Sequence, residues 1–506
     1  MPTPAPSRDP SRVRTASPAS LRARAPVACA ALVAAGCSLT AIDPAACREH
    51  ADCSAAFGVG SVCGDDGYCS ELRSHPRCSR SWPPELVEQP QDFGDAIVIG
   101  SLFGFTDHED TRRAAELAVR ELELQQGLEG QRVAMLHCDT TAGVDGLDDI
   151  EGAAAAARFL AETIGVPAIV GPRGSSRTQA VFEAVREHDV LVISPSATSA
   201  ALTGIDAVDP SFEHPGLLWR TVPPDTLQSA VIADDMRSRG VADVAVAYQR
   251  GAYGEGLASL FESRFVAQGG GTVERQPFES GQFAAIVAHL GDELRTGAID
   301  EVLFVSSDIA DYVGFLVAAT ATDDLAAAYT TAGTGIFLAD AAYNEMLLAQ
   351  GAAGAAALFT HVRGTRPAPA EGTLFNTFAA AYSAAQYGDA DASGFTPHAY
   401  DAAWLVLYGL ARAHFDEPAL GGSGIARGLR RISAGDPIDI VATSWPAVVE
   451  HFRGGQSIDV TGASGPLDYD PDTEETTAPI QLWAIEPDAM APSGFGFVEL
   501  ARVDPQ

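Results

Sequence analysis

Two stretches of this 506-residue chain place small and hydroxyl-bearing residues directly after an apolar run. Residues 168–176 read AIVGPRGSS, and residues 193–199 read ISPSATS. Small residues that follow a strand let backbone N–H groups and hydroxyls converge on an anion, and a carboxylate suits such a nest. Serine and threonine also favour helix N-termini, so helix capping is the competing interpretation. We predict anion binding, because both loops would lie at the carboxyl ends of strands.

The sequence contains no motif of comparable clarity for catalysis. The chain contains no GxSxG elbow, HExxH helix or Walker loop, and its 11 histidines are scattered. Residues 106–110 carry polar side chains that could ligate a metal, but Thr106 and Glu109 have the spacing of a capping box. We therefore expect no enzymatic activity, no cofactor and no metal.

The eight cysteines indicate disulfides once export is considered. Cys29 would leave with the signal peptide and Cys37 would carry lipid, so six others remain, namely Cys47, Cys53, Cys63, Cys69, Cys78 and Cys138. Five of these six lie within 32 residues amid Gly and Asp turns, which is typical of a small disulfide-bonded module with little core. Six cysteines permit 15 pairings, and Cys138 either pairs with Cys78 or stays free. A zinc site is less favoured, because the spacings lack paired CxxC motifs.

The first residues have the layout of a signal peptide. Five arginines and one aspartate precede the apolar run 27–36, which is too short to span a bilayer. The run ends VAAGC, which resembles a bacterial lipobox, so we expect Cys37 to be lipidated after removal of residues 1–36. Cleavage without lipidation is the alternative.

Net charge narrows the possible partners. The chain has 67 acidic and 32 basic residues, a net charge of −35, and loss of the leader leaves 66 acidic and 27 basic residues, or −39. Such a field repels phosphate backbones and anionic lipid headgroups, so it disfavours nucleic acid binding by charge neutralisation.

Apolar runs alternate with helical periodicity between residues 96 and 194. The expected strands are 96–100, 132–138, 167–171 and 190–194, with helices between them and a second series over 231–357. Alternation of this kind predicts parallel sheets covered by helices on both faces, in two lobes that face a cleft. Residues 399–413 form a further, strongly apolar helix in this interpretation.

Four more segments complete a recognisable order: WRTVPPD at 219–225, YGEGLA at 253–258, YDAA at 400–403 and TGASGPLDYD at 461–470. With the two loops described above, they resemble the branched-chain amino acid (Leu/Ile/Val) binding proteins of ABC transporters, a type I periplasmic binding protein family, over about residues 95–487. The resemblance implies an α/β fold of two doubly wound lobes with parallel sheets, joined by three crossover strands and preceded here by the Cys-rich module.

This fold divides the chain into seven expected parts. They are the signal peptide 1–36, the Cys-rich disulfide module 37–80, a linker 81–94, the first part of lobe 1 at 95–220, lobe 2 at 221–358, the return to lobe 1 at 359–435, and the third crossover with a C-terminal hairpin at 436–506.

The resemblance also implies ligand-binding positions. Ser175, Ala197 and Thr198 match family positions that hold the ligand carboxylate. Asp225 matches a family aspartate near the first crossover and would accept the ammonium group, although an ordinary turn role is equally compatible. Tyr253 corresponds to a family tyrosine at the cleft edge, where simple lobe packing is the alternative.

Three departures from the family pattern bear on the ligand. Residues 330–335 read TTAGTG, without the acid that commonly binds the ammonium group. Asp308, near the end of the expected 302–305 strand, could replace it, with helix capping as the alternative. The loop 100–110 is short, and Phe105 stands where an aromatic ring would line the cleft. The ligand class therefore includes amino acid-like solutes and small polar solutes such as an amide or a carboxylate without an amine.

These features together predict an exported solute-binding protein, lipid-anchored to a bacterial membrane in the periplasm or at the cell surface. Its partners would be a small solute and an ABC permease. Two alternatives remain at this point: a sensory receptor component without transport, which would work with a membrane receptor, and a surface interaction protein with a vestigial cleft.

Overall fold

The computed structural model describes residues 46–70, 73–206, 209–331, 335–370 and 372–505, all within one compact unit, Ala45–Gln506. The predicted signal peptide and the lipidation of Cys37 lie outside these residues. Within the described part of the chain, no helix combines the length and hydropathy needed to cross a membrane.

The first lobe is built on a six-stranded sheet with the strand order β3-β5-β4-β6-β7-β8. Its edge strand β3 is antiparallel to β5, and the remaining neighbours are parallel. The strands are β3 (Arg80–Trp82), β4 (Ile97–Phe103), β5 (Val133–Asp139), β6 (Ala168–Val170), β7 (Leu191–Ser194) and β8 (Leu218–Arg220). The four strands expected between residues 96 and 194 are therefore confirmed.

Side chains of alternate residues in these strands pack into two separate apolar layers, one on each face of the sheet. In β4, Ile97 and Ile99 pack on one face while Val98 and Leu102 pack on the other, as the period of two in a strand requires. The first face is covered by α3 (Glu109–Leu124), α12 (Thr373–Ala384), α13 (Thr396–Asp416), α14 (Gly422–Leu429) and α15 (Trp445–Arg453). The second face is covered by α2 (Glu85–Glu88), α4 (Asp149–Arg158), the π-helical turn Phe159–Ile164 and α5 (Ser175–Val185).

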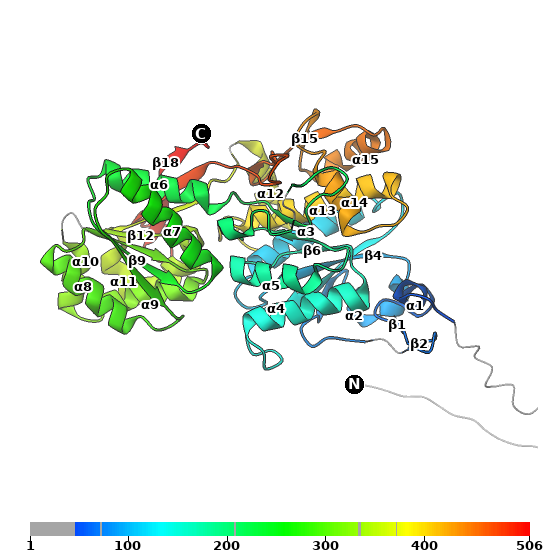
Figure 1. The fold of residues 1–506 in the computed structure, drawn as a ribbon, viewed down its shortest axis with the longest axis horizontal. Coiled ribbons are helices and arrows are strands. Elements are labelled where there is room, and N and C mark those ends of the chain that lie inside the picture. The colour runs from blue at the N-terminus through cyan, green and yellow to red at the C-terminus, as the bar shows by residue number, and fades with distance from the viewer. Residues whose placement is uncertain (1–45, 71–72, 207–208, 332–334, 371, 506) are drawn as a thin grey trace, which may run out of the picture. The chain divides into compact units, whose positions relative to one another are not determined.

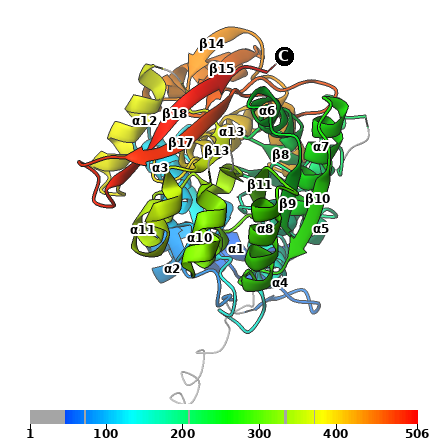
Figure 2. The same ribbon diagram turned by 90° about the vertical axis from the view of Figure 1, so that its left-hand side faces the viewer.

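The second lobe contains a seven-stranded sheet with the order β10-β9-β11-β12-β13-β17-β18 (Figures 1 and 2). Its strands are β9 (Val244–Gln249), β10 (Val273–Phe278), β11 (Glu301–Val305), β12 (Gly335–Leu338), β13 (Val362–Pro367), β17 (Ile480–Pro487) and β18 (Phe495–Val503). One face packs on α6 (Asp225–Ser238) and α7 (Ala252–Ala267). The other packs on α8 (Ala284–Thr296), α9 (Ile309–Ala319), α10 (Asp323–Thr330) and α11 (Glu345–Phe359).

Three crossings connect the lobes, as the sequence predicted. The chain passes from β8 to α6, returns from β13 to α12, and crosses again between β16 (Gly465–Pro466) and β17. A small sheet of β14 (Asp436–Asp439), β15 (Ile458–Gly462) and β16 precedes the third crossing. The Asp401 carboxylate accepts hydrogen bonds from Ala463 N (3.0 Å) and Ser464 N (2.7 Å), so α13 is tied to the turn that follows β15.

The structure differs from the expected boundary at the second crossing. Residues 362–367 were assigned to the return to lobe 1, but β13 lies in the second sheet. Ile336 of β12 pairs with Val362 in parallel, and Arg363 pairs with Ala484 of β17, so hydrogen bonds hold the strand on both sides. The C-terminal hairpin β17–β18 completes the same sheet.

The N-terminal module contains α1 (His50–Phe57) and a two-stranded ribbon, β1 (Val62–Cys63) and β2 (Cys69–Ser70). Disulfides join Cys47 to Cys63, Cys53 to Cys69 and Cys78 to Cys138. The disulfide prediction is thus confirmed, and the pairing that the sequence left open is resolved. The segment expected to be a linker is ordered, since β3 pairs with β5 and α2 follows it.

The capping box expected at Thr106 and Glu109 does not form. Helix α3 begins at Glu109, so its N-cap residue is His108, and Thr106 lies outside the first turn. The Glu109 carboxylate instead pairs with Arg112 (2.8 Å) and Arg113 (3.1 Å) one turn further along the same helix.

Candidate functional site

The loops at the carboxyl ends of the two sheets lie against one another, which is where α/β folds place ligands. From the first lobe come the loops after β4, β5, β6 and β7, and from the second lobe those after β9, β10, β11 and β12. The lobes meet directly: Ser176 Oγ accepts from Ala252 N (3.2 Å), and Ser199 Oγ donates to the Ala252 carbonyl (2.8 Å). Arg177 of the first lobe also lies 3.5 Å from Asp308 of the second.

Between these loops lies an inner cavity of only about 10 Å³, room for roughly one water molecule. It is lined by Arg173, Gly174, Ser175, Ser196, Tyr253, Ser307, Asp340, Ala341 and Phe395. Gly174 adopts φ +81°, a conformation that side chains disfavour, and its N–H donates to Ser196 Oγ (3.1 Å). The glycine therefore draws the β6 and β7 loops together.

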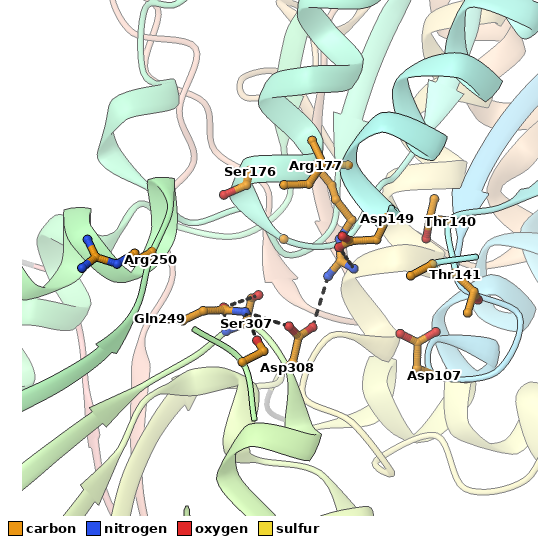
Figure 3. Close-up of a pocket in the computed structure, with 14 residues that line it drawn as sticks. Asp107, Thr140, Thr141, Asp149, Ser176, Arg177, Gln249, Arg250, Ser307 and Asp308 are labelled. Atoms are coloured by element: carbon orange, nitrogen blue, oxygen red, sulfur yellow. Dashed lines mark hydrogen bonds and ion pairs between the residues drawn. The ribbon is translucent and has the colours of Figure 1, made fainter. Parts of the chain in front are cut away.

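An outer cavity of about 390 Å³ shares Gly174 and Ser307 with the inner one (Figure 3). Most of its lining residues carry polar side chains, and they come from both lobes: Asp107, Thr140, Thr141, Ala142, Asp149, Ile150, Gly174, Ser176, Arg177, Gln249, Arg250, Ser280, Ser307 and Asp308. Because Gly174 and Ser307 line both cavities, the two lie next to one another between the lobes.

Ser175, Ala197 and Thr198 lie together at the first-lobe side of this site, and all three are buried. Ser175 Oγ accepts from Ser199 N (3.1 Å), so its hydroxyl joins two loops instead of capping its own helix. The Thr198 carbonyl accepts from Asp225 N (2.8 Å). The Ala197 carbonyl accepts from Arg220 Nη1 (3.1 Å). Their role in ligand binding stays a prediction.

A pair of buried carboxylates lies across from these loops. Asp225 is 0% exposed and Asp340 is 2% exposed, and each has one oxygen, Oδ2, that accepts no hydrogen bond from the described residues. Gln228, with its amide oriented to satisfy its neighbours, donates to Asp225 Oδ1 (3.1 Å) and accepts from Asp340 N (3.2 Å). Tyr253 donates its hydroxyl proton to Asp340 Oδ1, so the predicted tyrosine holds a carboxylate at the cleft.

The surroundings of these acids disfavour their charged forms. Burial raises the pKa of Asp340 to about 6. Burial and the neighbouring Asp340 carboxylate raise the pKa of Asp225 well above its usual range. Among the described residues, neither carboxylate forms a hydrogen bond or ion pair with a cationic side chain, so the pair is suited to receive a cation from outside.

Arg173 provides the opposite charge on the first-lobe side. Its side chain is 7% exposed and lies 4.0 Å from Asp110, with its guanidinium carbon 5.0 Å from the centre of the Phe395 ring. Nη1 donates no hydrogen bond within the described residues, and burial lowers the pKa of the group. A buried donor without a partner is costly, and an anionic ligand group would satisfy it.

Asp340 and Arg173 were missed as site residues. The sequence analysis considered residues 330–335 for an acid, but Gly335 begins β12, and a buried acid, Asp340, follows that strand. The apolar run at 336–339 followed by an acid was the available signal. Arg173 was read only as part of the loop after Gly171-Pro172.

Two other predicted residues are placed differently. Phe105 lies outside both cavities, and Arg80 covers its ring at 4.2 Å. Asp308 occupies the N-cap position of α9 but makes no side-chain cap bond. Its carboxylate faces the outer cavity, where it accepts from Gln249 Nε2 (2.9 Å) and pairs with Arg177 (Figure 3).

Outside the cleft, Glu274, His289 and Glu293 of the second lobe could each offer one ligand atom to a metal, with these atoms within 4.8 Å of one another. His289 is already hydrogen-bonded to Glu274 (2.7 Å), and the group lies partly exposed on β10 and α8.

Comparison with known proteins gives a consistent picture. Residues 100–445 match the model of a family described as periplasmic binding protein. Leu/Ile/Val-binding protein homolog 3 of Brucella melitensis is 28% identical over 171 residues, 33% of this chain and 41% of that protein. The chemotactic signal transduction system substrate-binding protein BasB of Halobacterium salinarum is 27% identical over 235 residues, 44% of this chain and 50% of that protein. These matches thus span half or less of either relative's length.

Solved structures share the fold over a larger part of the chain. A leucine-binding protein LivK from Thermotoga maritima aligns with a TM-score of 0.60 and 17% identity, covering 81% of this chain and 99% of that one. A solute-binding protein of an ABC transporter from R. palustris, in complex with 4-hydroxybenzoate, aligns with a TM-score of 0.62 and 16% identity, covering 81% and 98%. Two α/β lobes joined by crossovers are common to this chain and these proteins.

Proposed function

Because this chain belongs to the periplasmic binding protein family, a family of non-enzymatic solute-binding proteins, we propose that it is an exported lipoprotein that captures a small amino acid-like or polar carboxylate solute between its lobes for an ABC transporter. One observation carries the proposal. Arg173 from the first lobe and Asp340 from the second line the same interlobe cavity, and each is buried with a polar atom that lacks a hydrogen-bond partner among the described residues.

The charges of Arg173 and Asp340 indicate how the two ends of an amino acid-like solute would be oriented. The carboxylate is directed to Arg173 and to the hydroxyls and N–H groups of the loops after β6 and β7. The ammonium group is directed to Asp340, which Tyr253 holds in position, with Asp225 behind it. Solutes that lack the amine, as in the relatives of known structure with aromatic acids, would use the Arg173 side alone.

The inner cavity also indicates how the solute enters. A volume of about 10 Å³ is too small for an amino acid, so binding requires the lobes to separate and then close over the solute. The three crossings supply the hinge. Contacts such as Ser199 Oγ to the Ala252 carbonyl would break in the open form and return on closure.

A thermal-shift screen with amino acids, amides and short carboxylates tests the binding site. Solutes that raise the melting temperature of the unaltered protein are expected to give no shift in the double variant Ser175→Ala/Thr198→Ala, because the variant loses both hydroxyls beside the carboxylate position. Each shift is measured against the variant's own melting temperature, so the roughly 1 kcal/mol lost with the Ser175 to Ser199 bond does not enter the comparison.

Ser263→Ala, on the exposed side of α7, serves as the matched hydroxyl control and should respond as the unaltered protein does. An undiminished shift in the double variant would show that the solute binds elsewhere.

A sensory role without transport is the second candidate, and the similarity to BasB favours it. Uptake of labelled solute separates the two. Deleting the gene should abolish high-affinity uptake if the protein serves a transporter, and should abolish only the cellular response to the solute if it serves a receptor. A surface interaction role based on the Cys-rich module would instead leave the thermal-shift screen without a ligand.

The proposed lipid anchor at Cys37 can be tested separately. Replacing Cys37 by serine should move the protein from the membrane fraction to the soluble exported fraction, because the thiol that accepts the lipid is gone. Mass spectrometry of the N-terminal peptide provides the readout. Cys29→Ser, within the leader, is the matched control and should leave anchoring intact; an unchanged membrane fraction in Cys37→Ser would contradict the assignment.

A further inference from the structure

The outer cavity continues the proposed binding site and differs from it in character. It shares Gly174 and Ser307 with the inner cavity, so a solute whose head group lies between Arg173 and Asp340 would extend its other end into the outer space. Of the outer lining, only Ala142, Ile150 and Gly174 lack a polar side-chain group. A volume of about 390 Å³ accommodates a chain of several atoms.

The charges around this space do not balance. Asp107, Asp149 and Asp308 line it together with two guanidinium groups, those of Arg177 and Arg250. Arg177 is shared between Asp149 (2.9 Å) and Asp308 (3.5 Å), as Figure 3 shows. Arg250 is paired outside the lining with Glu279 (3.2 Å), so the carboxylates outnumber the cations.

Asp107 is the carboxylate without a cationic partner in contact. Its side chain is 40% exposed; Oδ1 lies against Gly104 and receives no hydrogen bond within the described residues, whereas Oδ2 lies 3.7 Å from His108. His108 is kept neutral because burial and two arginines lower its pKa well below the usual range. Asp107 comes from the loop after β4, whereas Asp308 follows β11, so the two acids approach the cavity from different lobes (Figure 3).

We propose that the solute is an amino acid-like molecule with a cationic, hydrogen-bond-donating group at its far end, and that Asp107 is the specificity-determining counter-ion for that group in the outer cavity. This inference rests on the proposed function and names its substrate class. A branched aliphatic side chain would strip water from the carboxylates, hydroxyls and guanidinium of the cavity without replacing their hydrogen bonds. An anionic side chain would meet the excess of carboxylates and the protein's net charge of −35.

Calorimetric titration with L-arginine, L-glutamine, L-leucine and L-glutamate tests the proposal. The unaltered protein is expected to bind arginine at least about tenfold more tightly than leucine or glutamate. Asp107→Asn, which keeps the shape of the side chain, should weaken arginine binding by about tenfold and change glutamine binding by less than about twofold. Glu187→Gln, an exposed acid on the first lobe away from both cavities, controls for the loss of one negative charge and should change neither.

The outcomes separate this inference from the function on which it rests. Leucine binding as tight as arginine binding, or an equal loss for arginine and glutamine in Asp107→Asn, would overturn the cationic assignment and leave solute binding in place. Failure of all four amino acids to bind the unaltered protein would overturn this inference alone. The proposed function would then be decided by the thermal-shift screen, and it would be overturned if no amide or short carboxylate stabilised the protein either.

Discussion

Replacing Asp340 by asparagine is expected to weaken binding of any amine-bearing solute by at least about a hundredfold while making the empty protein more stable. Loss of a buried charge that pairs with the ligand removes a charge-assisted hydrogen bond worth roughly 2–5 kcal/mol. In the empty protein the same charge is unfavourable, because it is buried beside Asp225 without a cationic partner in contact. Asparagine keeps the acceptor for Tyr253 and removes that repulsion.

The pH dependence follows from the raised pKa of about 6 for Asp340 against an ordinary value near 3.8. Because the folded protein holds this proton more tightly than the unfolded chain does, the stabilising contribution is present below about pH 4 and is lost as the pH rises through 6. The loss is on the order of 3 kcal/mol, and Asp340→Asn should abolish it. Binding of an amine, in contrast, should fall as the pH drops below 6, since protonated Asp340 no longer attracts an ammonium group.

Chemical denaturation of the empty protein and calorimetric titration of the solute, each from pH 4.5 to 8, measure both effects. Glu187→Gln, the exposed control, should show unaltered curves. A variant that binds an amine-bearing solute with normal affinity would mean that another acid holds the ammonium group, and Asp225→Asn would then be the next substitution to measure.

Removing the Cys78–Cys138 disulfide should lower the free energy of unfolding by about 4 kcal/mol, the value expected for a loop of this size. The bond closes a 60-residue separation, and its sulfur atoms lie in the apolar layer beneath the first sheet. Cys138 belongs to β5, and the partner cysteine immediately precedes the edge strand β3. The unfolded chain of Cys78→Ala/Cys138→Ala therefore gains conformational freedom, and the folded edge loses its cross-link.

The Cys47–Cys63 disulfide offers the comparison. It spans 16 residues inside the small module, so Cys47→Ala/Cys63→Ala should loosen that module and leave the main unfolding transition near its original position. Denaturation followed by tryptophan fluorescence, with and without reductant, distinguishes the two variants. An equal effect on the main transition from both would show that the module and the first lobe unfold as one unit.

The architecture could be predicted because its signal is local. Strand β4 is an apolar run, and helix α3 repeats its apolar residues at Ala114, Leu117, Ala118 and Leu122, so each element can be recognised from its own residues. The capping box predicted at Thr106 and Glu109 does not form, although the spacing of the two residues is correct. Helix α3 begins at Glu109, and the Glu109 side chain pairs with arginines of the next turn.

The binding site depends on contacts between residues far apart in the chain. Ser175 could be named from its loop and its family likeness, but Asp340 stands 165 positions later, after strand β12, for which the sequence analysis named no strand. Likewise the even number of cysteines predicted disulfides, whereas the partners depended on which loops the fold brings together.

Sequence alone therefore determined the class of fold, the two lobes and the family, because hydrophobic periodicity and the order of motifs can be recognised from neighbouring residues. Tertiary structure alone decided which acid faces which arginine, how the cysteines pair and that a polar cavity continues the cleft. These features depend on contacts between segments far apart in the chain, and the energy of a buried charge depends on neighbours that no local pattern specifies.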